Sequence, residues 1–159
     1  MKVFIFSDSI PESVLQLICE NIKKFLKEAN PYDMQQTSVI SHVECQKIAN
    51  QVCQALGGNF KHDWRRDNNI RNKNKLSTKE LADKVLLEQY ENILVTVHFE
   101  KIQILDFLRE MGANEKVLEE AKKMDITKSV FYLNTGNSTF RVFQDKDKKG
   151  KQLNFLKMF

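Results

Sequence analysis

Short apolar runs of strand length alternate with longer amphipathic segments along most of this chain. Strands are predicted at residues 3–6, 37–41 and 93–97, each rich in β-branched or aromatic side chains. After each of them, apolar residues recur every three or four positions, as they do on the buried face of a helix. Because right-handed crossovers return each helix to the sheet, this alternation predicts a mostly parallel sheet with helices on both faces.

The helical segments carry recognisable ends. Ser77 and Glu80 have the spacing of a capping box, and Gly57-Gly58 predicts a left-handed cap at the end of the second helix. The apolar spacing places Leu86 and Ile102 on inner faces. Helices are predicted from residue 11 to about 30, at 43–56, from 77 to about 90, after His98 up to Gly112, and from about 115 to 124.

The C-terminal part of the sequence predicts a pair of antiparallel strands. Two alternating segments, residues 129–133 and 139–143, flank Asn134-Thr135-Gly136-Asn137, which is typical of a β-hairpin. Residues 153–159 are predicted as a last strand or a docked tail. With 159 residues the chain suits one domain, residues 1–159. The fold class is therefore predicted as a three-layer α/β sandwich, with a mostly parallel central sheet and a C-terminal antiparallel hairpin.

Composition excludes several classes of protein. No apolar run reaches the length of a membrane helix, and the N-terminus turns polar too early for a signal peptide, so no membrane insertion is expected. A cytoplasmic location is predicted, including a place within a large cytoplasmic, cytoskeletal or organellar assembly. Cys19, Cys45 and Cys53 are odd in number and lie in apolar helical patterns, which favours reduced, buried thiols. No metal site and no cofactor are predicted.

Positive charge is concentrated in one segment. Residues 59–76 show no sustained apolar period and are predicted as a long surface excursion, which is often a functional kind of loop. Docking on an acidic protein surface is one hypothesis, and contact with nucleic acid, by phosphate neutralisation and base stacking, is another. The candidate contact residues are Lys61, Trp64, Arg65, Arg66, Arg71, Lys73 and Lys75.

Polar residues follow the three predicted parallel strands. In such sheets ligands bind outside the carboxyl ends of the strands, and here those ends carry Ser7-Asp8-Ser9, Ser41-His42 and His98. Asp8 could form an ion pair with His98, hold a cation together with Glu44, or cap the turn before the first helix, a role open equally to Ser9. His42 is interpreted as a helix-entry residue next to solvent, or alternatively as a ligand.

Three fragments in this order resemble the histidine phosphatase superfamily, which includes the phosphoglycerate mutases. The fragments are MKVFIFSDS, VISHVECQKIANQV and ILVTVHFEKIQILDFL. They resemble, in turn, the family's first strand, its second strand with the following helix, and the later strand that ends in a phosphoryl-binding His. The C-terminal SVFYLNTGNSTFRVF also resembles the family's closing strands. The resemblance implies a phosphoglycerate mutase-like fold.

The same resemblance implies a degenerate catalytic site. The family's Arg-His-Gly nucleophile motif falls on Ser7, Asp8 and Ser9, and its helix Arg falls on Glu44, while His98 keeps the second His. Phosphoryl transfer by this mechanism needs a nucleophilic imidazole and guanidinium groups around the phosphate. No catalytic residue is therefore expected.

The hypothesis that follows is a catalytically inactive histidine-phosphatase-like domain, serving as a structural or adaptor subunit among other protein subunits. The alternative is a residual phosphatase, of the phosphohistidine phosphatase type, or a phosphoryl-ligand sensor. It would use His98, with His42 or Asp8 in altered ligand-binding roles.

Overall fold

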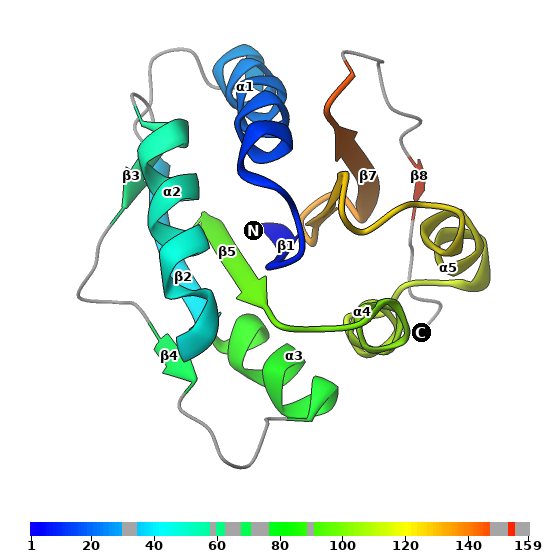
Figure 1. Cartoon of the computed structure of the whole chain (residues 1–159). Helices are drawn as coiled ribbons and strands as arrows, with labels where there is room; N and C mark the ends of the chain where they lie inside the picture. The colour runs from blue at the N-terminus through cyan, green and yellow to red at the C-terminus, as the bar shows by residue number, and fades with distance from the viewer. Residues whose placement is uncertain are drawn as a thin grey trace.

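The chain forms one mixed eight-stranded sheet with helices on both faces (Figure 1). The strands lie in the order β3-β2-β5-β1-β6-β7-β8, and β4 also pairs with β2. The three-layer α/β sandwich predicted from the sequence is confirmed. The computed structural model describes residues 1–29, 35–57, 60–62, 68–70, 77–88, 91–146 and 153–154.

Three parallel strands form the centre of the sheet: β1 (Lys2–Ser7), β5 (Asn92–Val97) and β2 (Gln35–His42). β5 lies between the other two and pairs in parallel with both. Every residue of β5 is buried, which is typical of a parallel strand covered by helices on both faces. This burial explains why the strand reads as a continuous apolar run rather than an alternating one.

The predicted excursion at residues 59–76 contains two short strands that the sequence did not reveal. β3 (Phe60–His62) pairs in parallel with the beginning of β2, and β4 (Asn68–Ile70) pairs in parallel with its end. A strand of three residues is too short to show a period of two, and its position here depends on backbone hydrogen bonds to β2. Two short parts of the predicted excursion are therefore strands, which the sequence analysis had not predicted.

The C-terminal hairpin is confirmed as an antiparallel pair, β6 (Ser129–Asn134) and β7 (Thr139–Gln144), with β6 antiparallel to β1. The Asn134 side chain accepts hydrogen bonds from the N–H groups of Gly136 at 2.9 Å and Asn137 at 3.3 Å, which fixes the turn. From the predicted C-terminal strand or tail, Leu153–Asn154 forms β8 against β7. The rest of that segment lies outside the described residues.

Two layers of helices enclose the sheet. α1 (Glu12–Ala29) and α2 (Gln46–Leu56) pack on one face, and α3 (Thr78–Leu87), α4 (Lys101–Glu110) and α5 (Glu115–Lys122) pack on the other (Figure 1). A short 3-10 helix, η1 (Val43–Cys45), precedes α2. Within the described part of the chain, no helix is long and apolar enough to cross a membrane.

Alternation along β1 divides the core between these layers. Phe4 and Phe6 pack with the α1 and α2 side chains, whereas Val3 and Ile5 pack with those of α3, α4 and α5. Successive side chains of a strand point to opposite faces of a sheet, so one strand supplies both cores. The two cores together hold the strand ends in place from both sides.

Local sequence signals set several helix ends. The Ser77 hydroxyl accepts a hydrogen bond from the Glu80 N–H at 3.1 Å, as the capping box predicted. The Asn114 side chain caps α5 through the Val117 N–H at 3.0 Å. Gly112, after α4, has φ 100°, a conformation that side chains with a Cβ rarely adopt.

Three local predictions are wrong. Leu86 and Ile102 are exposed, because the buried faces of α3 and α4 are rotated slightly from the predicted stripes. Gly57 itself has φ −32° and is not left-handed, and Gly58, the second residue of the predicted cap, lies outside the described residues. Cys53 is only partly buried, since it lies on the flank of α2 rather than on the face against the sheet. Cys19 and Cys45 are buried, as predicted.

Two leucines of α1 offer a matched test of this packing. Leu15 is 1% exposed and Leu17 is 53% exposed on the same helix. We expect Leu15→Ala to lower the free energy of unfolding by about 2 to 5 kcal/mol, because it leaves a cavity in the core. Leu17→Ala should change it by about 0.5 kcal/mol or less. Urea denaturation followed by circular dichroism measures both, and equal losses would contradict the assigned orientation of α1.

Candidate functional site

The carboxyl ends of β1, β5 and β2 meet at one edge of the sheet, where the residues that follow them form the candidate site. Ser7 pairs with Val97 between β1 and β5, and Ser41 pairs with Thr96 between β2 and β5. The N–H of Asp8 donates to the Val97 carbonyl at 3.1 Å, which continues the pairing past the end of β1. The strand ends predicted to converge therefore do so.

The side chains of Asp8 and His98 are in direct contact. Asp8 Oδ2 lies 2.6 Å from His98 Nδ1, and because a carboxylate only accepts, this ring nitrogen carries the proton. The side chains are 28% and 59% exposed, respectively. Solvent screening at this exposure limits the contribution of the pair to stability to about 1 kcal/mol or less. With Nδ1 engaged, the nitrogen of His98 that can meet a ligand is Nε2.

His42 lies behind this pair. Its Nδ1 accepts a hydrogen bond from the backbone N–H of His98 at 2.9 Å, so the proton of the neutral ring is on Nε2. The ring packs edge-on against Phe99, with centroids 5.3 Å apart. The prediction of a solvent-facing residue is wrong, since His42 is 4% exposed. β2 continues through His42, which pairs with Ile70 of β4, and η1 begins only at Val43.

The two serines of the first turn bond to each other. Ser7 Oγ lies 2.6 Å from Ser9 Oγ and accepts the Ser9 N–H at 3.2 Å. Among the described residues, the Asp8 carboxylate contacts His98 and makes no capping hydrogen bond to α1. The turn is therefore held by the Ser7 side chain, which leaves Asp8 directed at the site.

Cys45 and Glu44 of η1 (Val43–Cys45) complete the surroundings. Burial, and after it the negative charges of Asp8 and Glu44, raise the pKa of the Cys45 thiol to about 12. The two carboxylates thus act electrostatically on the same buried thiol. The apolar period of the sequence identified Cys45 as a core residue, but only the strand order brings it near the end of β1.

The arginines of the described ranges are engaged elsewhere than at these strand ends. Of the arginines there, Arg109 pairs with Asp106 on α4 at 2.9 Å. Arg141 lies over the rings of Phe25 and Phe143, at 5.1 and 4.4 Å from their centroids. In the same ranges no group of three or more His, Cys, Asp or Glu side chains is arranged to hold a metal ion.

The basic segment is anchored beside the site through its backbone. β4 pairs Asn68, Asn69 and Ile70 with the last residues of β2, which brings this part of the segment to the same edge of the sheet. Lys61 belongs to β3, at the opposite end of β2. The other predicted contact residues lie outside the described part of the chain: Trp64, Arg65, Arg66, Arg71, Lys73 and Lys75.

Comparison with known proteins gives one structural neighbour. No family model matches the chain, and no curated protein does. Among solved structures, the chain is similar to the crystal structure of phosphoglycerate mutase from Plasmodium falciparum, with a TM-score of 0.50 and 15% sequence identity. The match covers 99% of this chain and 96% of that one.

The chain has a phosphoglycerate mutase-like fold. This confirms the fold implied by the resemblance of the strand and helix fragments to histidine phosphatases. Identity at this level establishes the fold alone, and one fold supports many functions. Function must therefore be argued from the strand-end residues.

The raised pKa of Cys45 makes a prediction about alkaline stability. Above pH 9.0, the ordinary thiol pKa, the unfolded chain loses this proton, whereas the folded chain keeps it up to about pH 12. The folded state then binds more protons, so stability falls as pH rises through this window. From about pH 8 to about pH 10, the wild type should lose about 1.4 kcal/mol more than Cys45→Ala. Urea denaturation at both pH values tests this, and parallel losses would contradict the assigned burial.

Proposed function

We propose that this chain is a catalytically inactive domain of phosphoglycerate mutase-like fold that acts as a structural or adaptor subunit of a larger protein assembly. The observation that carries the proposal is the Asp8 carboxylate at the end of β1, 2.6 Å from His98. In the histidine phosphatases that the sequence resembles, the position of Asp8 belongs to the nucleophilic His.

Electrostatics argue against phosphoryl chemistry at this edge. A carboxylate a few ångströms from a phosphate repels it by about 1 kcal/mol in water and by several in a drier site. In the resemblance to histidine phosphatases, Asp8 and Glu44 align with the nucleophilic His and with the helix Arg, so each would place a carboxylate where that family has a group that favours a bound phosphate. His98 supplies an exposed imidazole and His42 a buried one, but a transferring phosphoryl group also requires several cationic or N–H donors around its oxygens.

His98 nevertheless supports an alternative. Its Nδ1 is held by Asp8, and its side chain is largely exposed, so Nε2 can meet a ligand in a fixed orientation. A carboxylate that orients an imidazole in this way is the arrangement found in many catalytic bases. A residual phosphatase or a phosphoryl-ligand sensor that uses His98 is therefore the second candidate.

A phosphate-release assay separates the two candidates. We expect purified chain to release phosphate from a generic phosphomonoester no faster than buffer, and His98→Ala to behave identically. Asp106→Asn is a suitable control, because it removes an exposed carboxylate of similar kind from α4. Release by the wild type and by the control, abolished in His98→Ala, would overturn the proposed inactivity and establish the alternative.

The adaptor role draws on the basic segment. Six lysines and arginines face two acids between residues 61 and 75, a balance that favours an acidic protein surface as the partner. The proposed setting is a cytoplasmic assembly. Nucleic acid is the competing partner, and binding to it would weaken steeply between about 50 and 200 mM salt in a gel-shift experiment.

The mass of the native protein tests this role. In size-exclusion chromatography of cell extract, we expect the chain to elute well above its own 18.6 kDa together with another protein. Joint replacement Arg65→Gln, Arg66→Gln, Arg71→Gln and Lys73→Gln should shift it to the position of the free chain, since it removes most of the positive charge. Wild-type chain that elutes alone at its own mass would contradict the adaptor role.

A further inference from the structure

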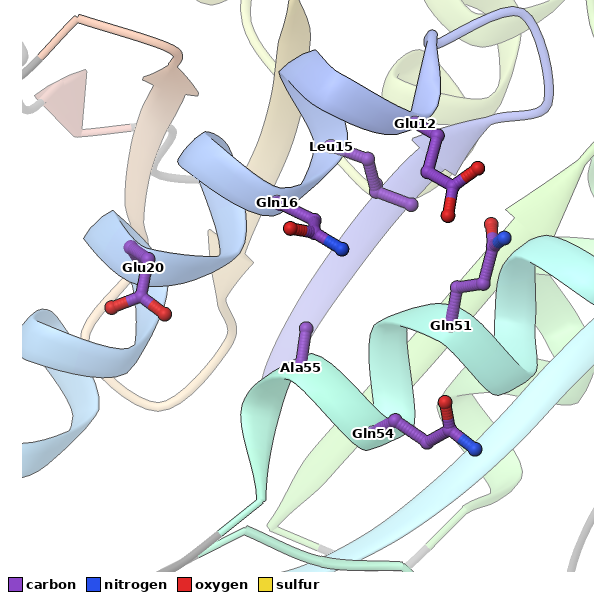
Figure 2. A pocket seen from close by; sticks show the side chains of 7 residues that line it. All are labelled: Glu12, Leu15, Gln16, Glu20, Gln51, Gln54 and Ala55. Carbon is purple, nitrogen blue, oxygen red and sulfur yellow. The ribbon is translucent and has the colours of Figure 1, made fainter.

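A groove of about 410 Å³ runs between α1 and α2, on the helical layer rather than at the strand ends. Figure 2 shows Glu12 and Gln16 of α1 and Gln51 and Ala55 of α2 directed into the space between the two helices. Glu20 lies at the other end of the α1 wall. This volume lies within the range of sites that hold small ligands or peptide side chains.

The charged side chains that line this groove are all acidic. Seven residues line the groove, and two of them are glutamates while none is basic. Within the described ranges, the side chains of Glu12, Glu20 and Gln51 form no hydrogen bond or ion pair. The groove therefore offers two carboxylates and amide groups to an external partner.

The spacing of the carboxylates limits what can fit. Glu12, Gln16 and Glu20 are four residues apart, so they form one stripe along α1, and the glutamates are separated by about 12 Å along the helix axis. The small Ala55 gives the groove an apolar surface between them, while Leu15 lines its floor and is 1% exposed. Lysine and arginine stems pack well on such a surface while their charged ends reach for carboxylates.

We propose that this groove docks a basic segment of a partner protein in extended conformation, with lysine or arginine side chains four residues apart. Such side chains leave the same face of an extended chain about 13 Å apart, which matches the separation of Glu12 and Glu20. The glutamine amides supply donors and acceptors for the backbone of the segment. This interaction goes beyond the proposed adaptor role, because it uses a different surface and a partner of opposite charge.

Peptide binding to the full chain tests the proposal. The probe is a fluorescently labelled Lys-Ser-Gly-Ser-Lys peptide with blocked ends, followed by fluorescence anisotropy at about 20 mM salt, where screening is weak. We expect saturable binding. Glu12→Gln and Glu20→Gln should each weaken it by a factor of about two to five, and the double variant by more, since each removes one ion pair.

Two controls separate this groove from general charge attraction. Glu28→Gln removes an exposed carboxylate from the same helix outside the groove and should leave the affinity unchanged. A Lys-Lys-Ser-Gly-Ser peptide, of equal charge and composition, should bind more weakly because its lysines are adjacent. Absence of saturable binding, equal weakening by Glu28→Gln, or equal affinity for the two peptides would each overturn the proposal. None of these outcomes depends on phosphate release or on the native mass. The peptide experiment can therefore fail while the proposed function holds, and the reverse.

Discussion

Two-sided burial of the parallel strands is the constraint on which the rest of this structure depends. β5 is buried along its whole length between β1 and β2 and is covered by helices on both faces. Its backbone groups are satisfied by the two neighbours, and its side chains divide between the two cores. A strand in this position cannot shift its register without exposing apolar side chains, so the ends of β1, β5 and β2 are fixed relative to one another.

The strand-end site follows from that fixed register. Asp8, His98 and His42 are far apart in sequence, yet one chain of contacts joins them, from the Asp8 carboxylate to the His98 ring and from the His98 backbone to the His42 ring. The fold is phosphoglycerate mutase-like, and among the described residues a carboxylate and two imidazoles lie at its strand ends. One fold can carry different sites, because core residues are constrained by apolar packing, whereas strand-end residues are constrained by the chemistry of the site.

The groove between α1 and α2 has a separate origin. Helices that pack on the same face of a sheet leave a channel wherever the facing side chains are small or point outward, and Ala55 opposite the Glu12–Glu20 stripe creates such a place. Its carboxylates are opposite in sign to the lysines and arginines that the sequence concentrates between residues 61 and 75. A domain with surfaces of opposite sign can bind two partners of different chemistry, which is what an adaptor requires.

The sequence by itself determined the order and type of the main elements, because periodicity reports directly on which residues are buried. It also identified the residues at the three strand ends and the capping box at Ser77. It could not reveal β3 and β4, whose pairing with β2 is a backbone interaction without a side-chain pattern. Only the tertiary structure decided that Asp8 bonds His98, that His42 is buried, and that Cys45 lies within reach of the same carboxylates. These contacts join residues from different strands, and strand order in a sheet is set by the packing of the whole domain rather than by any local segment.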